Sequence, residues 1–303
     1  MSRPPSGEQI ELSHRDQSAV VVEVGAGLRS YTVAGREILD GYGVDQLCTG
    51  GRGQPLIPWP NRVRDGRYEW NGKPLQLDIT EPARNNALHG LVNWRSWTAA
   101  QRTPSRVAMT HLLHPTPGYP FELELEIDYE LGDDGLTVTA TTLNASDERC
   151  PYGIGWHPYI APPGLEFIND CELTLPAASY QLADERLIPT GNASVEGTQF
   201  DFRRSRRFGD IVLDHCLLDL ERDQDELARM VVAGPVGSTT LWADANYPYL
   251  MVFSGDALAP PERRRGIAIE PMTCAPNAFV SGEGLIVLEP GQRHVSRWGI
   301  SFA

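Results

Sequence analysis

Residues 121–130 read FELELEIDYE, a strict alternation of apolar and acidic side chains. Successive side chains of a β-strand point to opposite faces of the sheet, so this pattern predicts a strand with one buried and one solvated face. The turn sequence GDDG follows at residues 132–135, and residues 136–143 return as the β-branched run LTVTATTL. Two such runs around a short glycine turn predict a β-hairpin in an antiparallel sheet.

Similar short runs recur along the chain, separated by glycine, proline, asparagine and aspartate. They are residues 19–24, 28–34, 107–114, 171–175, 211–220, 239–243, 249–253, 285–288 and 294–302. Helical periodicity is limited to one short candidate at residues 223–230. Many short strands with frequent turns predict an all-β sandwich or barrel. We expect one domain at residues 9–303, preceded by a flexible tail at residues 1–8.

Composition limits the partners and the compartment of the protein. The 303 residues carry a formal net charge of −14, which argues against nucleic acid or an anionic membrane as a partner. The five cysteines are widely spaced and include no C-x-x-C pair, as expected in a reducing compartment. The sequence shows neither an apolar signal region at its start nor a membrane-spanning stretch. We therefore expect a cytoplasmic protein.

One carboxylate interrupts an apolar, strand-like run, IAIEPMT at residues 267–273. Burying an ionised carboxylate costs several kcal/mol unless partners are waiting for it, so Glu270 is a candidate functional residue. Two histidines elsewhere in the chain, His89 and His157, have suitable surroundings for such partners. A carboxylate with two histidines from distant strands indicates a proton-transfer site or a metal site.

His157 lies in the segment GWHPY at residues 155–159, between aromatic side chains. An imidazole with a pKa of about 6.5 can donate or accept a proton near neutral pH. A core histidine bonded to a backbone carbonyl explains the same pattern, and both interpretations remain open. His89 follows the asparagine-rich loop RNNAL at residues 84–88, with two tryptophans just beyond. Amides and indole faces suit a polyhydroxylated ligand, although asparagine is also an ordinary turn residue.

Two further candidates are charged residues. Arg62 belongs to the proline-stiffened segment PWPNRVRDGR at residues 58–67, and a guanidinium can fork onto ligand oxygens. Asp214 follows the apolar run IVL at residues 211–213, where a turn or cap role is equally compatible with its position. No G-x-G-x-x-G before a helix, P-loop or G-x-S-x-G occurs, so nucleotide cofactors and acyl-serine chemistry lose their usual support.

Five short segments, taken in order, resemble the aldose 1-epimerase (galactose mutarotase) family. They are Asn61-Arg62, His89-Gly90, Gly155-Trp156-His157-Pro158-Tyr159, Asp214-His215 and Ile269-Glu270-Pro271. The similarity extends from about Gly25 to the C-terminus, and the G-W-H-P-Y and I-E-P blocks are its most specific parts. The resemblance implies a large antiparallel β supersandwich with an open sugar-binding cleft and with neither a metal nor an organic cofactor.

Residue roles follow from the same resemblance. Glu270 matches the general base of the family, and His157 matches its general acid. His89 matches a second active-site histidine that contacts the sugar and helps to hold charge. The expected starting state has an ionised Glu270 and a protonated His157, each favouring the charge of the other.

Substrate contacts are implied at four further positions. Arg62 and Asp214 match residues of the family that bind the sugar hydroxyls, and Asn61 and Trp156 are the additional candidates beside them.

The resemblance leaves the substrate open. The 84–89 loop and Trp156 look more like a poorly characterised bacterial branch of the family than like its galactose-specific members. A hexose-phosphate 1-epimerase is one alternative, with the arginine cluster at residues 203–207 as its hint. A non-catalytic sugar-binding protein is the second. A metalloenzyme with His89, His157 and Glu270 as ligands is the third.

Overall fold

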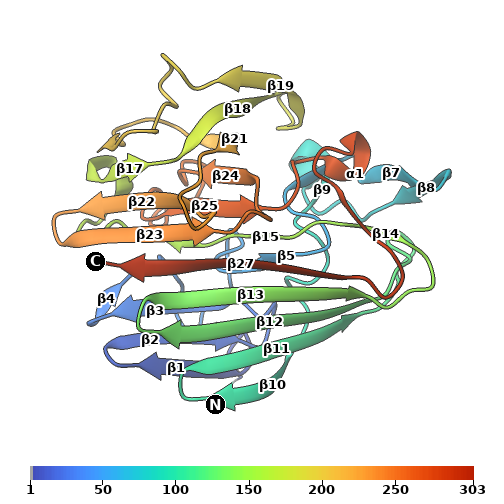
Figure 1. Ribbon diagram of the computed structural model, residues 1–303, viewed down its shortest axis with the longest axis horizontal. Coiled ribbons are helices and arrows are strands. Elements are labelled where there is room, and N and C mark those ends of the chain that lie inside the picture. The colour runs from blue at the N-terminus through green and yellow to red at the C-terminus, as the bar shows by residue number, and fades with distance from the viewer. Residues whose placement is uncertain (1–2) are drawn as a thin grey trace.

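Two large antiparallel sheets form the body of the computed structural model, which describes residues 3–303. The larger sheet has nine strands (Figure 1). In spatial order they are β10 (Thr98–Thr103), β11 (Arg106–Leu113), β12 (Leu123–Gly132), β13 (Gly135–Asn144), β27 (Arg293–Phe302), β23 (Gly237–Ala243), β22 (Ala228–Gly234), β17 (Glu172–Thr174) and β20 (Arg206–Arg207). The predicted hairpin is β12 and β13, with Leu123 opposite Asn144 and Gly132 opposite Gly135. Burial alternates along β12 as the sequence predicts.

The second large sheet has eight strands and carries three of the candidate site residues, Trp156, Asp214 and Glu270. Its path is β19 (Pro189–Ser194), β18 (Ala177–Ala183), β21 (Asp214–Leu220), β24 (Tyr249–Phe253), β25 (Ile267–Met272), β15 (Gly155–Trp156) and β5 (Pro55–Leu56), and β16 (Tyr159–Ile160) pairs with β25 off this path. All six residues of β25 are buried. That burial explains why its sequence reads as a continuous apolar run around Glu270.

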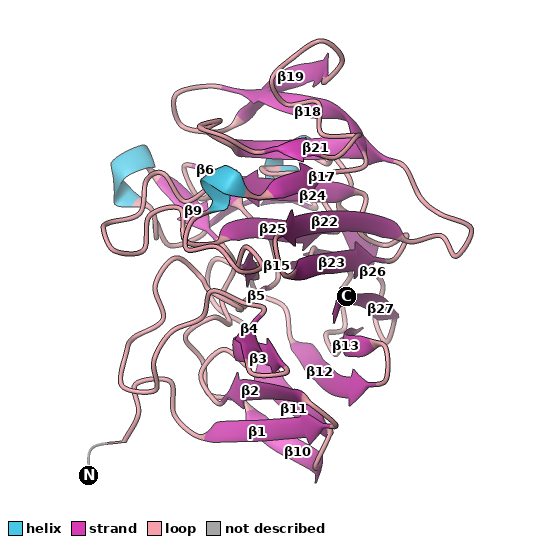
Figure 2. Cartoon of the chain, turned by 90° about the vertical axis from the view of Figure 1, so that its left-hand side faces the viewer, coloured by secondary structure: helices cyan, strands magenta, loops and turns pink. Residues whose placement is uncertain are grey.

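Smaller elements surround the two sheets. A four-stranded sheet of β1 (Gln9–His14), β2 (Gln17–Val22), β3 (Leu28–Val33) and β4 (Arg36–Glu37) packs against β11 and β12 (Figure 1). Three strand pairs are β6 (Arg62–Arg64) with β9 (Asn86–Leu88), β7 (Arg67–Trp70) with β8 (Lys73–Gln76), and β14 (Cys150–Tyr152) with β26 (Ile286–Leu288). The helices are short: η1 (Pro82–Arg84), η2 (Ile168–Asp170) and α1 (Ala278–Ser281) (Figure 2). Within residues 3–303 no helix has the length and apolar character needed to cross a membrane.

Aromatic side chains join the two large sheets through one core. Trp156 of β15 lies 5.3 Å from Trp298 of β27 and 6.3 Å from Tyr129 of β12, measured between ring centroids. Such pairs bury large apolar areas and stabilise sheet-on-sheet packing. The predicted all-β architecture of large antiparallel sheets is confirmed.

Two local expectations differ from the structure. The helix predicted at residues 223–230 is a turn followed by β22, because Oδ1 of Asp223 accepts the backbone N–H groups of Asp225 and Leu227. Of the tail predicted at residues 1–8, residues 1 and 2 lie outside the described residues. Ser6 is buried, and its carbonyl accepts the N–H of Val24 at 3.0 Å, so packed structure begins before Gln9.

Candidate active site

Six of the seven predicted site residues line one cavity of about 260 Å³ beside β25. They are Glu270 of β25, Asp214 at the start of β21, Arg62 at the start of β6, Asn61 just before it, His89 just after β9 and His157 between β15 and β16. Antiparallel pairing of β24 with β25 sets Met251 beside Glu270 and adds an apolar wall. The fold therefore gathers side chains that are widely separated in the sequence.

Glu270 is a buried titratable group of the cavity, with 2% of its surface exposed. Its Oε2 has no hydrogen-bond partner in the described part of the chain. Burial raises the pKa of Glu270 well above the usual range, the nearby carboxylate of Asp214 raises it further, and Arg62 partly opposes the shift. This shift favours the protonated form of the carboxyl group.

His157 faces Glu270 across the cavity floor, with Nε2 at 3.3 Å from Oε1 of Glu270. Burial lowers the pKa of His157 to about 3, and the positive charge of Arg52 acts in the same direction. The ion pair expected from the sequence is thus not the favoured state of these two groups. Desolvation of two buried groups outweighs their attraction, which favours a neutral imidazole beside a protonated carboxyl group.

His89 and Asn61 hold each other through backbone and ring atoms. The N–H of Asn61 donates to Nδ1 of His89 at 3.2 Å, and the N–H of His89 donates to the carbonyl of Asn61 at 2.9 Å. Both residues have positive φ, 55° for Asn61 and 63° for His89. Because Nδ1 accepts a hydrogen bond, the ring proton of His89 resides on Nε2. Burial lowers the pKa of His89 well below its usual value, so this residue is a neutral donor.

Arg62 is fixed by a carboxylate that the sequence did not single out. Its Nε and Nη2 donate to the two carboxylate oxygens of Glu81, each at 2.9 Å. Arg84 and Asn86 also donate to Glu81, at 3.0 Å and 2.9 Å. These donors hold the pKa of Glu81 below its usual value despite its burial. The position of Glu81 shortly before the asparagine-rich loop is the sequence feature that could have drawn attention to it.

Asp214 and Trp156, both predicted to contact substrate, lie in different places. Asp214 lines the cavity, and burial raises its pKa while the charge of Arg62 opposes that shift. Trp156 is fully buried on the core side of β15, where Nε1 donates to the hydroxyl of Tyr247 at 2.9 Å. Neighbouring residues of a strand point to opposite faces, so the segment that directs His157 into the cavity directs Trp156 away from it. Trp156 is therefore a core residue and not a wall of the cavity.

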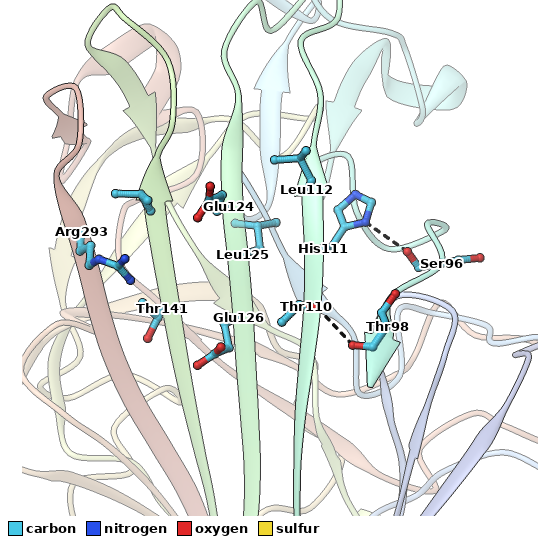
Figure 3. Close-up of a pocket in the computed structure, with 11 residues that line it drawn as sticks. Ser96, Thr98, Thr110, His111, Leu112, Glu124, Leu125, Glu126, Thr141 and Arg293 are labelled. Atoms are coloured by element: carbon cyan, nitrogen blue, oxygen red, sulfur yellow. Dashed lines mark hydrogen bonds between the residues drawn. The ribbon is translucent and has the colours of Figure 1, made fainter. Parts of the chain in front are cut away.

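A larger hollow of about 470 Å³ lies on the exposed face of β10 to β13 and β27 (Figure 3). Its histidine, His111, donates from Nδ1 to the carbonyl of Ser96 at 3.1 Å. Glu124 and Glu126 point outward from the solvated face of β12. Acid/base chemistry needs buried, mutually oriented groups, so the smaller cavity is the candidate active site.

The structure also bears on the metal site and on the arginine cluster suggested by the sequence. Among residues 3–303, no group of three or more His, Cys, Asp or Glu side chains is arranged to hold a metal ion. The alternative ligand set of His89, His157 and Glu270 is therefore not formed. In the arginine cluster, Arg203 pairs with Asp201, and Arg207 pairs with Asp170. Neither of these two arginines lines the cavity.

Comparison with known proteins gives the family. Residues 8–301 match the model of the Aldose 1-epimerase family. The uncharacterized protein YihR of Escherichia coli strain K12 is 33% identical over 290 residues, which cover 95% of this chain and 91% of YihR. Galactose mutarotase of Homo sapiens is 34% identical over 165 residues, which cover 52% of this chain and 46% of that protein.

Solved structures show the same fold at lower sequence identity. A GalM/aldose epimerase homologue from C. elegans superposes with a TM-score of 0.87 at 18% identity, covering 98% of both chains. Galactose 1-epimerase from Lactobacillus acidophilus superposes with a TM-score of 0.83 at 22% identity, covering 97% of this chain and 94% of that one. Since the family model spans nearly all of the sequence, this chain belongs to the aldose 1-epimerase family.

Proposed function

We propose that the protein is a cofactor-independent aldose 1-epimerase that interconverts the α and β anomers of a free hexose. One observation carries the proposal: a carboxyl group and an imidazole face each other at 3.3 Å in a buried cavity. Membership of the aldose 1-epimerase family supports a sugar as the substrate. General acid and general base groups at hydrogen-bond range are what ring opening of an aldose requires.

Ring opening needs one proton removed and one proton delivered. Glu270 takes the proton of the C1 hydroxyl while Nε2–H of His157 protonates the ring oxygen. The C1–O5 electron pair leaves with that oxygen, and a C1 carbonyl forms. After rotation about C1–C2, His157 takes back the O5 proton as O5 attacks the other face, and Glu270 returns its proton to the carbonyl oxygen.

The protonation state that burial favours fits this cycle. A protonated Glu270 beside a neutral His157 is the state that follows ring opening, and burial favours it. Transfer of one proton from Oε1 to Nε2 produces the ionised Glu270 and protonated His157 that begin ring opening. The two states contain the same number of protons, so no exchange with solvent is needed between them.

The remaining cavity residues suit the hydroxyl groups of a sugar. In the proposed complex, Nε2–H of His89 donates to a sugar oxygen, and Asp214 accepts from a hydroxyl. The guanidinium of Arg62 lines the cavity and is held by Glu81 through Nε and Nη2, and in the proposed complex its remaining N–H groups donate to sugar oxygens. These partners orient the substrate so that both proton transfers occur in one geometry.

A neutral sugar fits these charges better than a sugar phosphate does. The two arginines that line the cavity, Arg62 and Arg84, both bind Glu81. Asp214 and Glu270 supply carboxyl groups in the same space. Glu81 balances one of the two arginine charges and an ionised Asp214 balances the other, so a phosphate dianion entering there would find little uncompensated positive charge. We therefore propose a free aldose and not a hexose phosphate as the substrate.

Polarimetry tests the proposal. The optical rotation of freshly dissolved α-D-glucose and α-D-galactose is followed with and without the protein, and glucose 6-phosphate is added as a competitor. We expect a faster approach to the same final rotation, with weak competition by the phosphosugar. Rates equal to those of buffer, together with measurable sugar binding, would instead indicate a sugar-binding protein. Strong competition by glucose 6-phosphate would indicate a phosphosugar enzyme.

A further inference from the structure

The orientation of His157 has an unusual origin. Nδ1 of its ring is buried without a hydrogen-bond partner among residues 3–303, and Nε2 faces Glu270. A functional histidine is commonly oriented by a hydrogen bond from its second ring nitrogen to a carboxylate or carbonyl group. Packing must therefore supply the orientation that such a bond would otherwise give.

Tyr159 provides one side of that packing. Its ring stacks on the ring of His157 with centroids 5.0 Å apart and an interplanar angle of 15°. The Tyr159 hydroxyl donates to the carbonyl of Gly50 at 3.2 Å, so the phenol is itself held at its far end. His89 meets the same imidazole edge-on, at 5.4 Å between centroids. The imidazole is thus confined by two rings.

The glycine-rich segment at residues 50–53, GGRG, closes the remaining edge. A Cβ on Gly51 would lie 3.1 Å from Cδ2 of His157, and its φ of 70° favours glycine. The N–H of Gly53 donates to the carbonyl of His157 at 2.9 Å. This segment therefore contacts both the ring and the backbone of His157.

Arg52 is the one charged residue of that segment, and it reaches Tyr159. Its guanidinium carbon lies 4.5 Å from the centre of the Tyr159 ring, and only 3% of the side chain is exposed. Nη2 contacts Asp40 at 3.2 Å, and Nη1 contacts Glu262 at 3.5 Å. A buried guanidinium held by two carboxylates makes a rigid cation–π partner.

We propose that Arg52 is a positioning residue for His157 and acts through the ring of Tyr159. The chain of contacts runs from Asp40 and Glu262 to Arg52, from Arg52 to Tyr159, and from Tyr159 to His157. This inference rests on the proposed function, in which His157 transfers a proton to the ring oxygen. Arg52 itself touches neither Glu270 nor the cavity. Its role is to keep Nε2 of His157 in line with Glu270.

A pair of arginine variants tests the inference. Arg52→Met removes the cation that covers Tyr159, and kcat should fall about tenfold to a hundredfold while KM changes little, because misplacing a reacting group by about 1 Å has such a cost. Arg52→Lys keeps the charge but loses the planar fork, and should recover part of kcat. The matched control is Arg265→Met, since Arg265 pairs with the same Asp40 at 3.6 Å and has no contact with the stacked rings. That variant should keep wild-type kcat.

A double-mutant cycle separates positioning from general stabilisation. If Arg52 acts through Tyr159, Arg52→Met should cost little further kcat in a Tyr159→Leu background. Thermal unfolding midpoints of all variants show whether the fold persists. If Arg52→Met does not fold, the cycle is measured with Arg52→Lys and Tyr159→Leu instead. A kcat within twofold of wild type for Arg52→Met, or equal losses in both backgrounds, would overturn the inference.

A crystal structure of the Arg52→Met protein tests the positioning role independently of activity. We expect the separation between Nε2 of His157 and Oε1 of Glu270 to exceed hydrogen-bond range, beyond about 3.5 Å. An unchanged separation would overturn the inference even if the wild type is active. Absence of activity in the wild type would instead overturn the proposed function, and the structural measurement would still decide the role of Arg52.

Discussion

Nε2 of His157 lies 3.3 Å from Oε1 of Glu270, and the two side chains are only 7% and 3% exposed. Two opposite charges at this depth would each lose most of their hydration, which their attraction repays only with further partners. Oε2 of Glu270 and Nδ1 of His157 have no such partners within residues 3–303. The pair is therefore electrically neutral and shares one proton that can pass between the two side chains. In the proposed complex, a sugar beside these groups would supply the missing hydrogen bonds.

Replacing Glu270 by glutamine should nearly abolish turnover without preventing sugar binding. Glutamine keeps the shape of a protonated carboxyl group but cannot accept the C1 proton, so kcat should fall by about 10²–10⁴. Glu124→Gln is a suitable control, since Glu124 lies on the solvated face of β12 (Figure 3). Steady-state polarimetry and isothermal titration with the same sugar measure the two effects. A Glu270→Gln protein as active as wild type would remove Glu270 from the mechanism.

The dependence of kcat/KM on pH should lack the inflection of an ordinary histidine. Because burial lowers the pKa of His157 to about 3, the free enzyme does not gain a second proton on this ring near pH 6.5. After subtraction of the buffer rate, kcat/KM should stay level between about pH 7 and about pH 5. Burial also raises the pKa of Asp214, and the Asp214→Asn variant removes any contribution from that group. A fall with a midpoint near 6.5 that persists in Asp214→Asn would contradict this assignment.

The buried carboxyl group should make folding stability depend on pH in a defined direction. The pKa of Glu270 is raised in the folded state, so its favourable contribution is complete below the unfolded-state pKa and is lost as the pH rises. Glu270→Gln cannot ionise and escapes that loss. Its stability advantage over wild type should therefore grow by roughly 1.4 kcal/mol per pH unit above about pH 4.5 until the folded-state pKa is reached. Urea titrations at several pH values measure the difference, and a constant difference would show that Glu270 ionises normally.

Glu81 should matter for substrate binding although it does not line the cavity. Glu81→Gln loses the bidentate acceptor of Arg62, so the guanidinium is free to rotate away from the sugar. We expect KM to rise about tenfold, since one hydrogen bond to a charged group contributes about 1.5–3 kcal/mol. Asp184→Asn is the matched control, because Asp184 pairs with Arg64 of the same strand, outside the cavity. An unchanged KM for Glu81→Gln would show that Arg62 does not depend on this anchor.

The periodicity of apolar residues and the chemistry of single side chains explain which features the sequence could predict. The alternation at residues 121–130 predicts β12 because one face of that strand is solvated, and Glu270 stands out because β25 is otherwise apolar. Because Trp156 adjoins His157, the sequence predicts that it contacts the sugar. Consecutive strand residues face opposite sides of the sheet, however, and Trp156 lies in the core. The protonation state of the His157–Glu270 pair was also not predictable, because desolvation depends on the depth of burial.

Long-range contacts account for the residues that were not predicted. Glu81 and Arg52 are ordinary charged loop residues in the sequence, and their roles arise only when the fold brings them to Arg62 and Tyr159. Met251 becomes a wall of the cavity only through its register with Glu270. Periodicity reports the burial of a single strand but not its neighbour in the sheet.

Exchange between anomers at equilibrium tests the central claim most directly. Two-dimensional exchange NMR of equilibrated glucose and galactose measures the rate between the α and β anomeric protons with wild type, Glu270→Gln or His157→Asn. The proposed mechanism predicts exchange well above the buffer rate with wild type, and a loss of about 10²–10⁴ in both variants while they remain folded. Exchange at the buffer rate with wild type, or wild-type exchange in either variant, would contradict acid/base catalysis by this pair.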